Sequence, residues 1–211
     1  VDSGTRILVT LNVASLLPTA LEVLDRSPLE KVVVARLGTM LPLPKRFALA
    51  LLGRKSLATV PARADVLEWS EMRKHAIPMP VPIDPERDLA LIQYTGGTTG
   101  TPKGAMLTHQ NISANARQVQ AIDPRAGDRD MILGVLPLFH VFANVCVLNR
   151  TIANGGCIAM LPRFEAGQAL KTLQRVKATA MPGVPTMYQA LLDHPHFART
   201  DFSSLRICIS G

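Results

Sequence analysis

The sequence predicts an α/β protein in which repeated βα units form mainly parallel sheets. Two observations support this fold class. Short β-branched or apolar runs alternate with helical patterns along most of the chain, and the connections are long enough for crossover helices. The chain has 211 residues, of which 47% are hydrophobic and 18% are charged. This size allows one or two folded domains, and this composition excludes a disordered linker.

The first βαβ unit is expected over residues 6–35. The apolar run 6–10 and the β-branched run 31–35 predict two buried strands. Between them, residues 18–24 have a short helical pattern that opens on Pro18, a residue suited to the first turn of a helix. Two strands joined by a helix within about 30 residues are expected to lie parallel in one sheet.

The alternation breaks between residues 36 and 60. Prolines at positions 42 and 44 exclude a helix interior or a central strand there. Residues 45–55 are apolar in the middle and basic at both ends. The basic residues are Lys45, Arg46, Arg54 and Lys55. One interpretation is a surface helix packed on the domain, and the other is a basic amphipathic element that lies on an anionic membrane.

Residues 76–88 contain four prolines and predict an extended connection. We therefore expect three parts. The first is an α/β subdomain over residues 1–75 that includes the basic apolar insert at 36–60. The proline-rich connection at 76–88 leads to a second α/β subdomain over residues 89–211, which carries a glycine-rich loop.

Strand and helix patterns alternate again in the second subdomain. Strands are predicted at residues 89–94, 131–138, 157–161, 178–181 and 205–210. Helices are predicted at residues 108–121, 141–153, 166–176 and 185–192. Thr108 or Asn111 is expected to cap the first of these helices, and the run Asn154-Gly155-Gly156 is expected to close the second.

Composition narrows the class of partner. The net charge of +7 is compatible with nucleic acid, anionic lipid or phosphorylated small molecules. Aromatic residues make up only 4% of the chain, so few side chains could stack on nucleic-acid bases, and no nucleic-acid partner is expected. Three widely spaced cysteines and a polar N-terminal start favour a cytoplasmic location, with peripheral contact at the inner face of the membrane as the second interpretation. The sequence does not indicate the oligomeric state.

A loop rich in glycine and threonine follows the strand predicted at 89–94. Residues 94–104 read Tyr-Thr-Gly-Gly-Thr-Thr-Gly-Thr-Pro-Lys-Gly. Glycines let the backbone approach a ligand, and turned backbone amides form a concave site for phosphate oxygens. Lys103 adds a positive charge suited to a polyphosphate, and Thr95 is a candidate metal ligand.

Neither of two common phosphate-binding motifs matches this loop. In the P-loop a glycine stands directly before the lysine, whereas Pro102 precedes Lys103 here. In the G-x-G-x-x-G motif one residue stands between the first two glycines, whereas Gly96 and Gly97 are adjacent here. The alternative interpretation is a flexible surface loop. A strand before the loop and a helix after it are expected, and this arrangement favours ligand binding.

Residues 94–104 closely resemble the [YT]-[ST]-G-T-T-G-x-P-K-G signature of AMP-forming adenylating enzymes. This superfamily includes acyl-CoA synthetases, luciferases and peptide-synthetase adenylation domains. The double glycine, the continuation at 105–111 and the insert at 36–60 are most similar to bacterial long-chain fatty-acid–CoA ligases. The resemblance covers nearly the whole chain and implies a fragment of the large N-terminal domain of an adenylate-forming enzyme. A chain that stops at the end of a predicted strand, at Gly211, also suggests a fragment.

The resemblance implies a set of site residues. Lys103 and His140 would be catalytic, and Thr95 would contact the metal. His140 ends the stretch 136–140, which resembles the family's P-L-F-H segment beside the acyl and adenylate pocket; taken alone, it would be interpreted as a core histidine. The implied ATP/AMP-binding residues are Tyr94, Thr95, Gly96, Gly97, Thr98, Thr99, Gly100, Thr101, Lys103, Gly104 and Gly211. Residues 183–188 resemble the segment that lines the acyl tunnel.

The implied reaction is the activation of a long-chain fatty acid by ATP. The carboxylate attacks the α-phosphorus to give an acyl-adenylate and pyrophosphate, and coenzyme A then displaces AMP to give acyl-CoA. Mg²⁺ and Lys103 would stabilise the phosphate charge. The family's magnesium-binding glutamate, ribose-binding aspartate and C-terminal lysine would follow Gly211, so the 211 residues alone are expected to be incomplete for catalysis. The alternatives are a nucleotide-binding fragment without turnover and a ligase for a medium-chain or aromatic acid.

Overall fold

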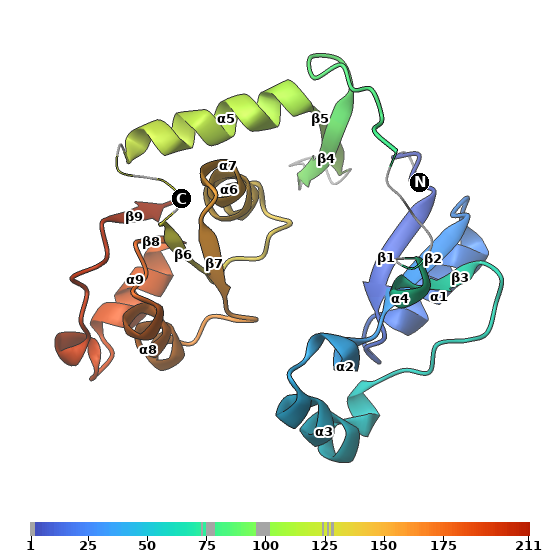
Figure 1. The fold of residues 1–211 in the computed structure, drawn as a ribbon, viewed down its shortest axis with the longest axis horizontal. Coiled ribbons are helices and arrows are strands. Elements are labelled where there is room, and N and C mark those ends of the chain that lie inside the picture. The colour runs from blue at the N-terminus through green and yellow to red at the C-terminus, as the bar shows by residue number, and fades with distance from the viewer. Residues whose placement is uncertain are drawn as a thin grey trace. The chain divides into compact units, whose positions relative to one another are not determined.

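The computed structural model describes residues 3–72, 74, 79–95, 102–123, 125, 127 and 129–211. The chain divides into two compact units, residues 1–82 and 83–211, which are coloured from blue to teal and from green to red in Figure 1. Each unit contains a parallel sheet with helices, so the α/β class is confirmed. None of the described helices is both long enough and apolar enough to cross a membrane.

The first unit is built on a three-stranded parallel sheet in the order β1–β2–β3. Its elements are β1 (Ile7–Leu11), α1 (Leu17–Arg26), β2 (Lys31–Ala35), α2 (Leu37–Met40), α3 (Leu43–Leu52), the 3₁₀ turn η1 (Arg54–Ser56), β3 (Val66–Glu68) and α4 (Trp69–Met72). The expected βαβ unit is present as β1, α1 and β2. The parallel register runs from Ile7 opposite Lys31 to Leu11 opposite Ala35.

Helix α1 covers the sheet with one apolar face. Leu17, Ala20 and Leu24 are buried, and their spacing of three and four residues places them on the same side of the helix. They pack against Val32 and Val34 of β2, which are also buried. Burying a large aliphatic side chain contributes about 1.5–3 kcal/mol, so this cluster is the main source of stability within the unit.

The insert forms helix α3, but the helix does not pack on the core of its unit. Pro44 lies in its first turn, where proline does not remove a helical hydrogen bond. No residue of α3 is buried, and its main contacts are with α2 and η1, its neighbours in sequence. The interpretation of a helix packed on the domain therefore does not describe α3.

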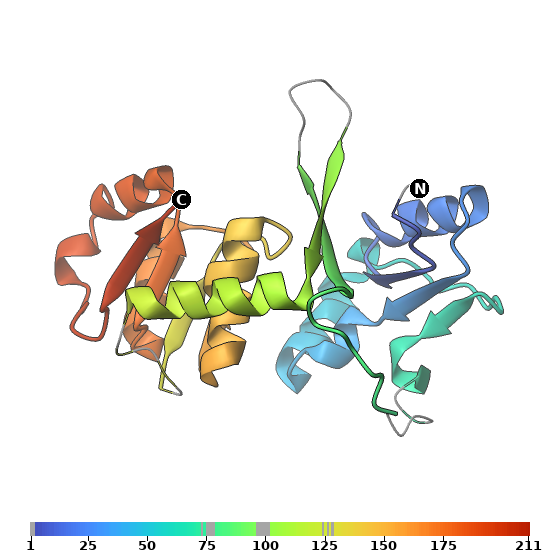
Figure 2. The same cartoon turned by 90° about the horizontal axis from the view of Figure 1, so that it is seen from above.

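The second unit contains a four-stranded parallel sheet in the order β7–β6–β8–β9 and a separate antiparallel hairpin of β4 and β5 (Figure 2). Its elements are β4 (Leu89–Thr95), β5 (Lys103–Thr108), α5 (His109–Ile122), β6 (Met131–Gly134), α6 (Val141–Ala143), the π-helical segment η2 (Asn144–Asn149), α7 (Arg150–Asn154), β7 (Cys157–Met160), α8 (Ala166–Val176), β8 (Ala180–Gly183), α9 (Pro185–Leu192), the 3₁₀ turn η3 (Phe197–Arg199) and β9 (Ile207–Ser210).

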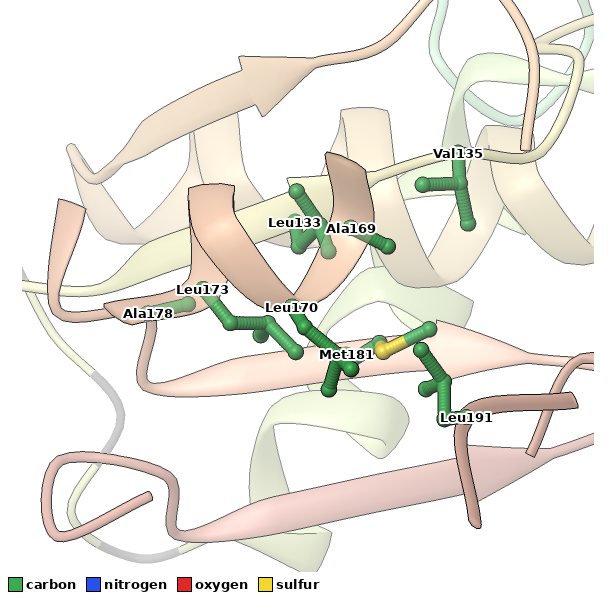
Figure 3. Packing of buried hydrophobic residues seen from close by; sticks show 8 residues of the cluster. All are labelled: Leu133, Val135, Ala169, Leu170, Leu173, Ala178, Met181 and Leu191. Carbon is green, nitrogen blue, oxygen red and sulfur yellow. The ribbon is translucent and has the colours of Figure 1, made fainter. Parts of the chain in front are cut away.

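Helices cover both faces of the four-stranded sheet. Leu133 of β6 belongs to a buried cluster with residues of α8 and α9, which Figure 3 shows from close by. The preceding residue, Ile132, belongs to a second cluster with Ala143 of α6 and Val147 of η2. Successive side chains of a strand point to opposite faces, so β6 joins two cores. A parallel sheet buried on both faces holds its strand ends rigidly, which is what a site at those ends requires.

A buried ion network lies where β6 and β9 begin. Arg150, with a side chain that is 1% exposed, lies 3.4 Å from carboxylate oxygens of both Asp123 and Asp130. Arg206 pairs with the same two carboxylates, at 2.9 Å to Asp123. Burial opposes ionisation of Asp123, but the hydrogen bonds from Arg206 and the Arg125 backbone, together with the positive charges of Arg206 and Arg150, outweigh it and lower the pKa of this carboxyl. Opposite charges at this end of the sheet are therefore matched within the fold.

Candidate functional site

The glycine-rich loop joins two strands of a hairpin. The helix expected after the loop is present as α5 from His109, but residues 103–108 form a strand, β5, that the sequence analysis did not predict. Strands β4 and β5 pair with Thr95 opposite Lys103 and Tyr94 opposite Gly104. Residues from Lys103 onward form a strand because their backbone groups make cross-strand hydrogen bonds with β4. The predicted site residues Gly96, Gly97, Thr98, Thr99, Gly100 and Thr101 lie outside the described residues.

The junction between the hairpin and α5 is fixed by a reciprocal cap. The Thr108 hydroxyl accepts a hydrogen bond from the backbone N–H of Asn111 at 3.2 Å. The Asn111 side-chain oxygen accepts one from the backbone N–H of Thr108 at 3.0 Å. Both residues predicted as alternative caps therefore act together, which stops the strand and starts the helix at one defined residue.

The base of the loop brings three predicted site residues together. The Thr95 hydroxyl lies 3.4 Å from the carbonyl oxygen of Lys103, its cross-strand partner. The Lys103 side chain is exposed and makes no ion pair with the residues that the structure describes. At Gly104, an added Cβ would lie only 2.7 Å from Cγ2 of Ile92, so glycine is required by the close packing. An unpaired cation therefore stands beside a hydroxyl at the base of the loop.

His140 lies on the surface of the segment that follows β6. The strand ends at Gly134, earlier than the predicted residue 138, and the chain turns through Pro137 before α6. His140 is exposed, and its ring lies 4.8 Å from the ring of Phe139, centroid to centroid. The alternative of a core histidine is therefore wrong. Because the His140 side chain is exposed, its imidazole is accessible to a ligand.

Two contacts join distant parts of the chain to this segment. The Gln93 side-chain amide donates a hydrogen bond to the carbonyl oxygen of Phe139 at 2.9 Å. Gly211 lies at the end of β9, where an added Cβ would approach the Phe142 ring to 2.9 Å. The hairpin, the His140 segment and the end of β9 are thus linked at the carboxyl ends of parallel strands, the usual ligand site of such sheets. Sequence reasoning missed Gln93, because no local pattern signals a partner 46 residues away.

Tyr188 fixes the segment predicted to line an acyl tunnel. Its hydroxyl lies 2.6 Å from the carbonyl oxygen of Met181 and 2.9 Å from that of Ile209. Burial, with a smaller contribution from Cys208, raises the pKa of this phenol. Its ring also lies close to Gly183, where an added Cβ would be 3.1 Å away. Tyr188 therefore holds α9 against β8 and β9 and is not set up to release a proton.

The described ranges hold no group of three or more His, Cys, Asp or Glu side chains arranged to bind a metal. A magnesium ion that accompanies a nucleotide needs less from the protein, because phosphate oxygens and water fill most of its six positions. The Thr95 hydroxyl oxygen stands at the base of the loop beside Lys103 and is a suitable hard ligand for such an ion.

The family described as "AMP-binding enzyme" matches residues 2–211 of the chain. The long-chain-fatty-acid–CoA ligase of Bacillus subtilis is 35% identical over the whole chain. A feruloyl-CoA synthase from Amycolatopsis is 39% identical over 63% of the chain and 26% of its own length. The chain spans 38% of the length of the Bacillus protein.

Solved structures with this fold include the N-terminal domain of FACL13 from Mycobacterium tuberculosis, with a TM-score of 0.62 and 23% identity. The match covers 99% of this chain and 56% of that one. ATP-bound MatB from Rhodopseudomonas palustris matches with a TM-score of 0.65 and 22% identity, over 100% of this chain and 46% of its own. At these identities the likeness supports the fold alone.

Proposed function

The chain belongs to the AMP-binding enzyme family, and we propose that it supplies the ATP-phosphate loop and part of the acyl pocket of an AMP-forming long-chain fatty-acid–CoA ligase. The observation that carries this proposal is the link between the Lys103 hairpin and the His140 segment through the hydrogen bond from Gln93 to Phe139. This link supports the proposal because it joins the hairpin that carries the exposed Lys103 to the segment that carries the exposed His140.

The proposed reaction has two steps that share this site. A carboxylate oxygen attacks the α-phosphorus of ATP, and the bond from that phosphorus to the bridging oxygen breaks to release pyrophosphate. The sulfur of coenzyme A then attacks the acyl carbon, AMP leaves, and the thiol proton passes to solvent. Both steps bring anions together or separate them, so oriented cations and amides reduce the barrier.

Each residue has a distinct part in the proposal. Lys103 binds the phosphates as a point charge, and the residues from Tyr94 to Gly104 surround them with backbone and hydroxyl donors. His140 borders the acyl-adenylate, and Gly211 leaves space for the adenine. Thr95 would hold Mg²⁺, which supplies charge neutralisation on the phosphates when bound.

We favour a long-chain acid as substrate because the Bacillus relative, which matches the whole chain, carries that name. An aromatic acid is the second candidate, because the feruloyl-CoA synthase is 39% identical over 63% of this chain. The discriminating experiment is acid-dependent ATP–pyrophosphate exchange by the full-length protein with palmitate, octanoate and ferulate. A long-chain ligase exchanges fastest with palmitate, whereas faster exchange with ferulate would replace the substrate and leave the adenylation chemistry in place. No exchange with any acid would reduce the proposal to nucleotide binding.

We also propose that α3 rests on an anionic membrane, where long-chain acids collect. Residues 31–64 contain no acidic residue. Lys45, Arg46, Arg54 and Lys55 make no ion pair with described residues, whereas Arg36 and Arg63 are paired with carboxylates. Between the basic positions, Phe47 and Leu51 are 67% and 80% exposed. This pattern fits a cytoplasmic protein that contacts the inner face of the membrane peripherally.

Co-sedimentation with vesicles tests the membrane proposal. Replacing Lys45, Arg46, Arg54 and Lys55 with Gln should weaken binding to phosphatidylserine vesicles by well over tenfold, because each basic residue near an anionic surface contributes about 1 kcal/mol. The matched control removes four exposed cations of the second unit by changing Arg117, Lys171, Arg175 and Arg199 to Gln. Equal loss in both variants would show a net-charge effect and refute a role for α3.

A further inference from the structure

We propose that Gln93, Asn144 and Asn149 are positioning residues that hold the backbone of the His140 segment against the phosphate-loop hairpin. The inference rests on the proposed function, because it assigns a purpose to the placement of His140. It goes further in naming three side chains, none of which belongs to the glycine-rich loop.

Three consecutive carbonyl groups of this segment are held by donors from two other elements. The Asn144 side-chain amide lies 3.5 Å from the carbonyl oxygen of Leu138, and its backbone N–H donates to that of His140 at 2.9 Å. The Gln93 amide donates to the carbonyl oxygen of Phe139 between them, at 2.9 Å. Leu138 packs against the cluster that contains Ile132. Phe139 is 72% exposed and His140 is exposed, so packing does not fix these last two residues, and hydrogen bonds to their backbone do.

Asn149 orients the Asn144 amide through the π-helical turn. Its side-chain nitrogen donates to the side-chain oxygen of Asn144 at 2.7 Å. Residues five apart do not face each other on an α-helix, where neighbours are three or four apart. In η2 the backbone follows the wider π-helical turn, which brings position i+5 under position i. The bond occupies the Asn144 oxygen and leaves its nitrogen to face Leu138.

Gln93 also settles which side of the hairpin faces His140. Side chains two residues apart on a strand share a face, so Gln93 and Thr95 lie on the same side of β4. Their cross-strand partners, Ala105 and Lys103, share that face. The face that meets the Phe139 carbonyl is therefore the one that carries Thr95 and Lys103. The small Ala105 side chain opposite Gln93 leaves the longer side chain room to reach Phe139.

A double-mutant cycle in the full-length protein tests the proposal. Gln93→Met keeps the side-chain length and removes the donor, so acid-dependent ATP–pyrophosphate exchange should fall roughly three- to tenfold in kcat, with the KM for ATP within twofold. In a His140→Ala background the same change should have little further effect, because Gln93 acts through His140. Asn149→Leu should cause a smaller loss of the same kind. Equal losses from Gln93→Met in both backgrounds, or no loss in either, would overturn the proposal.

Imidazole NMR of the full-length protein gives a readout that does not depend on activity. Gln93→Met should shift the ring resonances of His140, assigned by loss in His140→Gln, and leave those of His194 and His196 unchanged. The matched control is Gln189→Met, which removes a surface glutamine bond to Asp193 and should leave His140 unchanged. If the protein exchanges no pyrophosphate but His140 shifts as expected, the proposed function fails and the positioning role stands. An unchanged His140 resonance refutes the positioning role alone.

Discussion

The two ends of the four-stranded sheet differ in whether their charged side chains have ion-pair partners among the described residues. We call the end where β6 begins the enclosed end and the opposite end the open end. Where β6 begins, Arg150 and Arg206 are enclosed with Asp123 and Asp130 and all four charges are matched inside the fold. At the other end, the Lys103 cation has no ion-pair partner among the described residues and His140 is exposed. Charges that the fold satisfies contribute to structure, and charges that it leaves unsatisfied are available to a ligand. The comparison predicts that substitutions at the two ends have separable effects.

The largest expected effect is at the enclosed end. Asp130→Asn removes one carboxylate that pairs with both the buried Arg150 and the partly buried Arg206, and it should lower the free energy of unfolding by about 3 kcal/mol or more. Adenylation per folded molecule should be unchanged. Chemical denaturation of the full-length protein measures the first quantity, and exchange at low temperature measures the second. The exposed Glu22→Gln control, which breaks a surface pair with Arg26, should leave stability nearly unchanged.

At the open end, Lys103→Ala should lower the rate of adenylate formation by about 100- to 1,000-fold, the effect of removing one stabiliser of transition-state charge. Thermal unfolding should be unaltered, because the ammonium has no ion-pair partner among the described residues. A stability loss as large as that of Asp130→Asn would contradict the division between the two ends.

Gly104→Ala should have an intermediate effect and reach both quantities. The new methyl group would lie 2.7 Å from Cγ2 of Ile92, so the hairpin must shift, at a cost of about 1–3 kcal/mol. Lys103 is the adjacent residue, and adenylation should fall with the displacement. Gly127→Ala is the matched control, because an added Cβ there meets nothing within 4 Å. If Gly104→Ala matches that control, the close packing of the hairpin does not matter.

The smallest expected effect is a pH dependence of stability. The pKa of Asp123 is lower in the folded protein than its usual value near 4, because its hydrogen bonds and the nearby charges of Arg206 and Arg150 together outweigh burial. Its contribution is therefore fully present above that usual value and is lost as the pH falls through the lowered folded pKa. Denaturation of wild type and Asp123→Asn from pH 6 to pH 2 should show the difference between them shrinking toward acid. A difference that grows toward acid would contradict the sign.

The fold was largely predictable from local pattern, whereas the site was predictable only in part. The bounds of β2, α8 and α9 agree with their sequence predictions to the residue, because β-branched runs, helical spacing and an opening proline act over short distances. The residues of β5 carry no strong strand pattern of their own, and they pair because β4 lies opposite. Strand β5 therefore forms because of its pairing with β4 and not because of its own sequence pattern.

The same limit applies within the site. Loop composition was enough to select Thr95 and Lys103 as candidates. The exposure of His140 and the bond between Gln93 and Phe139 depend on how β6 and the hairpin meet, and the π-helical turn of η2 lies in a stretch whose apolar pattern predicts only a helix. Contacts between residues far apart in sequence leave no local signal to recognise.

The most direct test of the open end is to locate bound nucleotide in the full-length protein. Mn²⁺·ATP broadens the resonances of nuclei near the metal, so imidazole NMR can compare His140 with His194 and His196, which lie beside α8. We predict that Mn²⁺·ATP broadens His140 selectively and that Lys103→Ala abolishes the effect at the same nucleotide concentration. Selective broadening of His194 and His196, with His140 unchanged, would place the nucleotide elsewhere and contradict the account.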